Sequence, residues 1–299
     1  MTTKLPMTRT LLWILGACVF FFLFKTYGAD PRTVWFALTL ADVWILLFAA
    51  LVQSTVPFLR AGRWMRLRCS RSDHITFGSA LAVTSASAVV ASITPARLGE
   101  ASRLAMKGGS ERRVLPDLTA EYFADGWILL VLALSFGCVE GKLVSLPVAL
   151  ALGLVLVGVA PYVYALAPRF LKLLPFNRVR AYLDEAKIGE STPWISVLVY
   201  GFGIHVVTFG SAVLAFDALS SEIPTLTLIK GLVIGQLVGI FSLLPMGFGT
   251  REAGVAGVLA LADYSGEDIL AALVCHRVIT TFVVAAFGIL SIRSLARWS

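Results

Sequence analysis

Two short polar stretches, residues 94–100 and 244–252, interrupt long apolar runs and carry residue types that can bind a charged ligand. Each stretch combines proline and glycine with an arginine and a glutamate. A charge at the centre of a bilayer costs at least about 2.5–3.5 kcal/mol. Irregular backbone at that depth persists only where it is buried in protein or lines a wet cavity. If the flanking runs lie in a membrane, the two stretches therefore predict a polar site inside it.

The first stretch has the residues to bind an anion. Pro95 disfavours the helical conformation of the preceding residue, so we expect the entering helix to end there. Gly99 allows close backbone approach, and a helix that restarts at Glu100 would direct free N–H groups and a partial positive charge toward the site. Arg97 and Arg103 add guanidinium groups, whose planar fork matches phosphate. Glu100 is a candidate partner for one of these arginines.

The second stretch repeats this composition with different spacing. Pro245, Gly247 and Gly249 open the backbone before Arg251 and Glu252 begin another helix. We expect this tip to contribute a second set of headgroup contacts. The alternative for both stretches is that arginine and glutamate only neutralise each other and fasten a broken helix.

A pair of carboxylates lies in the fourth apolar run. Glu121 and Asp125 are four residues apart, so they share one face of a helix. They could relay protons, act as an acid/base pair, or neutralise arginines such as Arg97, Arg251 or Arg277. We favour neutralisation of arginines. Arg277 lies inside the last apolar run and needs a partner or water there.

The elements that position these residues must be membrane helices. The chain of 299 residues is 58% hydrophobic and only 14% charged, against about 25% charged in soluble domains. This predicts an all-α polytopic membrane protein, with residues 1–299 forming one integral membrane domain. The net charge of +7 comes from Lys and Arg clustered between apolar runs, a pattern that orients spans. We therefore expect no nucleic-acid partner, and we find no metal-ligand spacing, nucleotide phosphate loop or hydrolase motif.

Charge placement favours a specific topology. Apolar runs occupy about 11–26, 34–57, 75–94, 118–138, 143–166, 193–218, 226–245 and 269–292. Eight full spans would put successive basic loops on opposite sides, against the positive-inside rule. Six spans plus two inverted re-entrant hairpins, 75–107 and 226–262, keep every basic cluster and both termini cytoplasmic. Paired interrupted segments of this kind indicate a transporter site near the midplane. Residues 168–192 read either as an amphipathic helix on the cytoplasmic membrane surface or as a loop.

The chain resembles the flippase-like transmembrane domain of the lysylphosphatidylglycerol synthase family, over nearly its whole length. The resemblance rests on Arg63-Trp64, Pro95 to Glu100 with Arg103, Glu121 with Asp125, Pro245 to Glu252, and Arg277. It departs from the family at Tyr122, where the pattern has arginine after the glutamate. The resemblance implies movement of a lipid with a polar or phosphorylated headgroup between leaflets, here without the aminoacyl-transferase domain that some relatives carry. A tryptophan beside an arginine after a span is ordinarily an anchor at the membrane interface. The resemblance implies that Arg63 also supports the site.

We therefore expect a flippase of the inner (plasma) membrane with no cofactor, no metal and no catalytic residues. Arg97, Arg103 and Arg251, with the helix starts at both tips, would hold an anionic headgroup, and Glu100, Glu252, Glu121 and Asp125 would balance these arginines or couple movement to protons. Two alternatives stay open. One is a membrane transferase that acts on a lipid carrier, with Glu121 and Asp125 as acid and base. The other is a non-catalytic subunit of an envelope-synthesis complex. A homo-oligomer or an envelope enzyme is the partner class left open beside the lipid.

Overall fold

The computed structural model describes residues 31–70, 75–104, 111–140, 143–171, 192–219, 222–242, 244–264 and 267–296. Within these ranges the secondary structure is entirely helical, which confirms the all-α fold. The predicted first span, 11–26, and most of the predicted surface segment 168–192 lie outside the described residues. The α-helices and two 3₁₀ helices (η) are, in chain order, α2 (Pro31–Leu40), α3 (Val43–Gln53), α4 (Val56–Ser70), α5 (Phe77–Ser92), η1 (Pro95–Leu104), α6 (Glu111–Glu140), α7 (Leu146–Leu171), α9 (Trp194–Asp217), α10 (Thr225–Phe241), η2 (Pro245–Gly247), α11 (Thr250–Leu261) and α12 (Glu267–Ala296).

Five helical stretches of the described residues are long and apolar enough to cross a membrane. They are Val43–Ser70, Val114–Val139, Pro147–Leu166, Trp194–Asp217 and Ile269–Ser291. Each corresponds to one of the six predicted full spans, and the sixth is the run 11–26 outside the described part. The apolar helices Phe77–Ser92 and Thr225–Phe241 are shorter, and they coincide with the two segments predicted to be hairpins.

The bounds predicted for the second span, 34–57, differ from those in the structure. The helix α2 ends at Leu40, and Asp42 then caps α3 by accepting hydrogen bonds from the N–H groups of Trp44 and Ile45. The long apolar stretch runs instead from Val43 to Ser70. Consequently the arginines of residues 60–68, which we expected in a cytoplasmic loop, lie on α4. Two of them are buried there, and carboxylates on α6 are their partners.

The first hairpin consists of α5 and η1, which pack against each other. The helix α5 ends at Ser92 with Ile93 as its C-cap, one residue before the predicted break at Thr94. The returning segment is a 3₁₀ helix that begins directly at Pro95. A Cβ atom on Gly99 would lie only 2.3 Å from the backbone carbon of Val90, so glycine is required where the two arms meet.

The second hairpin consists of α10, η2 and α11. Its arms are antiparallel, because Gly239 approaches Gly247 and Arg251 while Gly231 approaches Val255 and Leu259. At the tip, Met246, Gly247 and Gly249 all have positive φ angles of 50°, 63° and 81°, a conformation that glycine adopts at least cost. At 1.5 Å per residue, α10 and α11 extend only about 25 and 18 Å, less than the ~30 Å hydrocarbon core of a bilayer.

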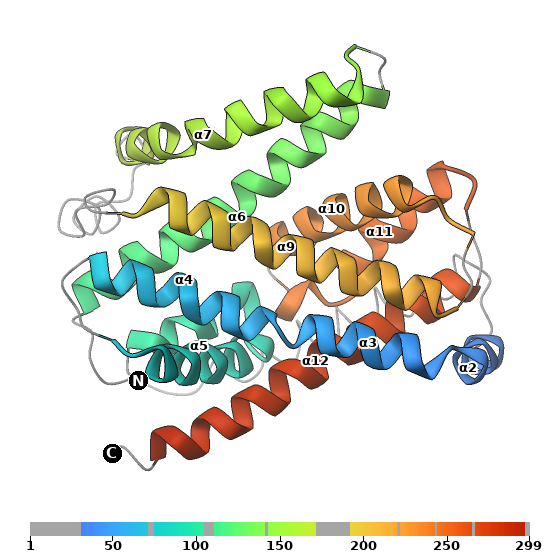
Figure 1. The fold of residues 1–299 in the computed structure, drawn as a ribbon, viewed down its shortest axis with the longest axis horizontal. Helices are drawn as coiled ribbons and strands as arrows, with labels where there is room; N and C mark the ends of the chain where they lie inside the picture. The colour runs from blue at the N-terminus through green and yellow to red at the C-terminus, as the bar shows by residue number, and fades with distance from the viewer. Residues whose placement is uncertain are drawn as a thin grey trace, which may run out of the picture.

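The two hairpins enter the bundle from opposite ends and meet inside it. In Figure 1, α5 lies toward one end of the long axis and α10 with α11 toward the other. Their tips are in contact, since η1 packs against η2 and α5 also contacts η2. The long helices α4, α9 and α12 pass alongside them (Figure 1). The main apolar core gathers around α9, α10, α11 and α12, with Phe216, Leu232 and Leu259 among its fully buried side chains.

Candidate functional site

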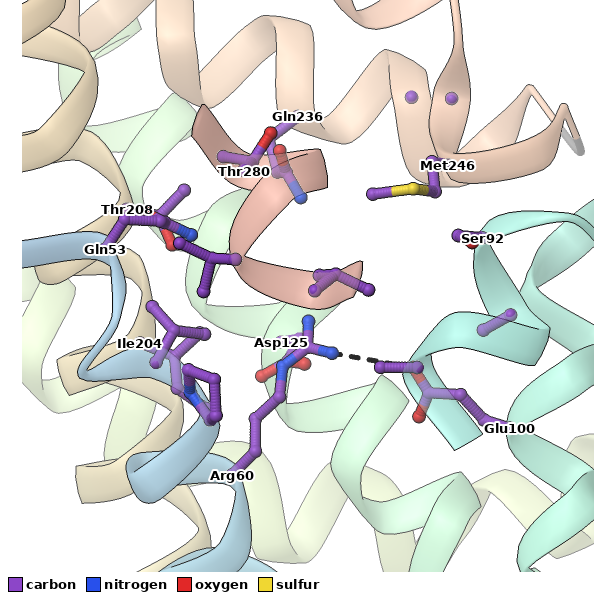
Figure 2. Close-up of a pocket in the computed structure, with 18 of the residues that line it drawn as sticks. Gln53, Arg60, Ser92, Glu100, Asp125, Ile204, Thr208, Gln236, Met246 and Thr280 are labelled. Carbon is purple, nitrogen blue, oxygen red and sulfur yellow. Dashed lines mark ion pairs between the residues drawn. The ribbon is translucent and has the colours of Figure 1, made fainter. Parts of the chain in front are cut away.

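A cavity of about 330 Å³ lies where the two hairpin tips meet. Its wall combines residues of both hairpins with residues of α3, α4, α6, α9 and α12. Figure 2 shows Ser92 and Glu100 of the first hairpin opposite Gln53 and Thr208, with Met246 of the second tip beside Ser92. The polar side chains on this wall are Gln53, Arg60, Thr84, Ser85, Ser92, Glu100, Tyr122, Asp125, His205, Thr208, Gln236, Arg251, Arg277 and Thr280. A cavity with this many polar side chains on its wall, inside an apolar helical bundle, is the candidate site.

The first hairpin is fastened to α4 and α6 by a network of buried ion pairs. Arg103 donates from Nη1 to Glu121 Oε2 and from Nη2 to Glu100 Oε2, both at 2.9 Å. Arg63 donates from Nε to Glu121 Oε1 at 3.2 Å and from Nη1 to Asp125 Oδ1 at 2.6 Å. Each of these five side chains is at most 12% exposed. Breaking a buried pair of this kind costs about 3–5 kcal/mol.

Two neighbours hold the Arg103 guanidinium in this position. Its Nε donates to Ser87 Oγ on α5 at 3.0 Å, and its Cζ lies 4.6 Å from the centroid of the Trp64 ring. Trp64 is only 2% exposed. One turn further along α4, Arg68 forms a second buried ion pair, with 3.5 Å between its Nη1 and Asp117 Oδ2. Trp64 therefore supports the ion-pair network and does not act as an anchor at the membrane interface.

Arg60 connects this network to the cavity. Its Nη1 lies 3.9 Å from Glu100 Oε1, and its side chain is 23% exposed. Figure 2 shows the pair reaching across one side of the cavity. Arg60, Arg63 and Arg103 are thus matched by Glu100, Glu121 and Asp125, so three arginines face three carboxylates.

The second hairpin is fastened to α12 through Glu252. Its Oε2 accepts the N–H of Gly249 at 2.9 Å, which caps the start of α11. Its Oε1 accepts from Arg277 Nε at 2.9 Å and also from Nη2. Arg277 Nη1 donates to the carbonyl oxygen of Met246 at 3.3 Å. Glu252 therefore pairs with Arg277 on the last span rather than with its neighbour Arg251.

This arrangement leaves Arg251 as an unbalanced positive charge. Among the residues that the structure describes, Arg251 makes no ion pair, and its Nη2 lies 3.4 Å from His276 Nδ1. It is partly buried and lines the cavity. Arg251 and Arg277 face one carboxylate, Glu252, so this side of the site has an excess charge of +1. An anion is the ligand that would complete it.

The predicted site residues separate into two groups. Glu100, Asp125, Gly247, Arg251 and Arg277 line the cavity. The others stand behind its wall and hold it in place: Arg63, Gly99, Arg103, Glu121, Pro245, Gly249 and Glu252. The side chain of Arg97 lies outside the described residues, so its contact with a headgroup stays a prediction. Glu121 and Asp125 do meet arginines, but these are Arg63 and Arg103 rather than Arg251 or Arg277.

Several lining residues were missed by the sequence analysis. Gln53, Gln236 and Arg60 come from three different helices and meet only in the folded bundle. No motif joins them, although a polar residue inside an apolar run is itself a signal. The described residues contain no group of three or more His, Cys, Asp or Glu placed to hold a metal ion.

A protein family matches most of the chain. The model of the family described as "Lysylphosphatidylglycerol synthase TM region" matches residues 11–288. The match covers both hairpins, the charge network and all the helices that line the cavity. No curated protein matches the chain. The family points to a membrane role related to lipids.

Proposed function

We propose that this chain, which belongs to the lysylphosphatidylglycerol synthase TM family, moves a lipid with an anionic headgroup between the leaflets of the inner membrane. The observation that carries the proposal is the positive charge of Arg251, which has no carboxylate partner among the described residues, on the wall of a cavity with many polar side chains. A buried charge without a counter-charge is costly unless a ligand supplies one. A lipid phosphate does so, while its acyl chains stay in the surrounding bilayer.

The two hairpins suit this task. Helices too short to cross a bilayer end inside it, so they bring irregular backbone and polar groups to the midplane, where transporter sites lie. The start of α11 adds to the positive potential of the site, because the N-terminus of a helix favours an anion. The cavity of about 330 Å³ has room for a headgroup but not for a whole lipid. We place both termini on the cytoplasmic side, with the hairpins re-entering from opposite sides of the membrane.

The proposal is tested by leaflet exchange in liposomes that contain the purified protein. Fluorescent acyl-labelled anionic and zwitterionic lipids are quenched from outside with dithionite, and the loss of protected signal is timed. Wild type is expected to accelerate exchange of anionic lipids. Arg251→Ala is expected to slow it about 10- to 100-fold, since hydrogen bonds to a charged group contribute about 1.5–3 kcal/mol. Arg66→Ala, at an exposed arginine on α4, is the matched control and is expected to be silent.

Each alternative function gives a different result. A transferase would form a new covalent lipid product when a labelled donor is added, and its activity would depend on Glu121 and Asp125. A non-catalytic subunit would give no acceleration with any lipid and would be insensitive to Arg251→Ala. Equal exchange by wild type and Arg251→Ala would exclude Arg251 as the group that binds the headgroup.

A further inference from the structure

Four polar atoms of uncharged side chains that line the cavity have no hydrogen-bond partner within the described part of the chain. They are Gln53 Oε1, Ser85 Oγ, His205 Nε2 and Gln236 Oε1. The four side chains come from α3, α5, α9 and α10, so four separate helices deliver them to one wall. Gln53, Ser85 and His205 are only 6%, 5% and 5% exposed. Buried polar groups in folded proteins normally have partners, so a cluster of four without them indicates that a ligand completes the set.

The chemistry of these atoms restricts that ligand. A glutamine oxygen only accepts hydrogen bonds, whereas a serine hydroxyl and a neutral histidine nitrogen can donate or accept. The terminal torsion of glutamine is broad, so both amides can turn into the cavity at little cost. Figure 2 shows Gln53 beside Thr208 and Gln236 beside Thr280 on one side of the cavity. As the side chains stand, the two glutamine oxygens call for hydrogen-bond donors on the ligand.

Charge decides which donors fit. An ammonium group would donate, but the carboxylates on the wall, Glu100 and Asp125, are already paired with Arg103 and Arg63. The lining residues include three arginines against these two carboxylates, and this excess of positive charge opposes a cation. Neutral hydroxyl groups donate without adding charge. His205 Nε2 lies 4.0 Å from Asp125 Oδ1, beyond hydrogen-bond distance, so this nitrogen can bond a ligand hydroxyl.

We propose that the cavity contains a hydroxyl-binding subsite formed by Gln53, Ser85, His205 and Gln236, next to the anion subsite at Arg251. The substrate class is then an anionic lipid whose headgroup carries free hydroxyls, from a glycerol or a sugar. The subsites are neighbours, because Gln236 lies between Gly235 and Gly239, the two residues of α10 that pack directly against Arg251. That the ligand is a lipid rests on the proposed function. That its headgroup carries hydroxyls rests on the four polar atoms without partners.

The test compares two lipids of equal charge in the leaflet-exchange assay. Phosphatidylglycerol and phosphatidylethanol are both anionic phosphodiesters, and only the first has free hydroxyls on its headgroup. Wild type is expected to move phosphatidylglycerol roughly tenfold faster, the effect of one or two net hydrogen bonds. Gln53→Leu and, from a different helix, Gln236→Leu are expected to bring that ratio close to one. Arg251→Ala should slow both lipids and leave the ratio unchanged. Phosphatidylinositol distinguishes a sugar-like ring from glycerol.

A stability measurement separates binding from folding. Each leucine variant removes an unpartnered polar atom, so its unfolding temperature should be no lower than that of wild type, whereas a purely structural glutamine would lower it. Equal exchange of the two lipids by wild type, with silent leucine variants, would overturn the hydroxyl subsite and leave the flippase proposal standing.

If neither lipid is moved, the flippase proposal fails and a binding measurement decides the inference. Short-chain dihexanoyl phosphatidylglycerol and dihexanoyl phosphatidylethanol are added to the purified protein in detergent, and thermal unfolding is followed. Greater protection by the glycerol lipid, lost in Gln53→Leu, supports the subsite. Equal protection by the two lipids contradicts it.

Discussion

The two broken hairpins share their residue types but use them differently. In the α5–η1 hairpin, Glu100 and Arg103 pair with each other and join a buried network in which three arginines meet three carboxylates. In the α10–α11 hairpin, Glu252 pairs with Arg277 and leaves Arg251 with only a histidine contact. Among the described side chains, the charges of the first hairpin are therefore balanced and those of the second are not. Similar sequence signals can thus build either a support or a binding site, and the balance of charges distinguishes the two.

We expect the largest effect when the loss of protein stability is compared between alanine variants of the two hairpin arginines, Arg103 and Arg251. Arg103→Ala leaves Glu100 and Glu121 buried without that partner, so we expect a loss of about 3–5 kcal/mol in the free energy of unfolding. Arg251→Ala removes a charge that has no carboxylate partner among the described residues, and we expect less than about 1 kcal/mol. Thermal unfolding in detergent measures both. Equal losses of stability would mean that the two arginines have the same role in their hairpins, against the distinction between a support and a binding site.

A middle-sized effect tests whether both tips need glycine for close approach. A Cβ atom on Gly99 would lie 2.3 Å from Val90, and one on Gly247 would lie 2.7 Å from Gly239. Both contacts are with backbone, so we expect Gly99→Ala and Gly247→Ala each to lose about 1–3 kcal/mol. Gly257→Ala is the matched control on α11, since its Cβ would meet nothing within 4 Å. That change should be neutral or stabilising, because alanine favours helix.

The smallest effect concerns the aromatic support of the first hairpin. Trp64→Phe keeps an aromatic ring under Arg103 but weakens its attraction for the guanidinium. We expect a loss of about 1 kcal/mol in stability, with no change in the preference of the transporter among headgroups. A changed headgroup preference would show that the network reaches the ligand directly.

The parts of the fold that depend on local backbone chemistry could be predicted from the sequence. Pro95, Pro245 and the nearby glycines located both hairpin breaks, because they act on the conformation of their immediate neighbours. Apolar runs located five long spans for the same reason, except where Asp42 caps a helix inside a run and shifts the second span.

Ion pairs could not be predicted in this way. Arg251 and Glu252 are adjacent in sequence, but consecutive residues of a helix point about 100° apart, so Glu252 meets Arg277, 25 residues away. Arg63 meets Asp125 across 62 residues. The neutral cavity residues Gln53 and Gln236 have no local signature at all, because their meaning arises only when helices from both halves of the chain come together.

The pairing of Glu252 with Arg277 also has a consequence for biogenesis. A chain is made from its N-terminus at about 5–20 residues per second, so Glu252 is synthesised roughly one to five seconds before its partner. The glycine contacts can bring α10 and α11 together without α12, but Glu252 then lacks its arginine. The last helix, α12, is therefore the element that completes the hairpin. A chain truncated before residue 277 would keep Glu252 but lack this arginine, so its second hairpin would carry a buried carboxylate without its partner.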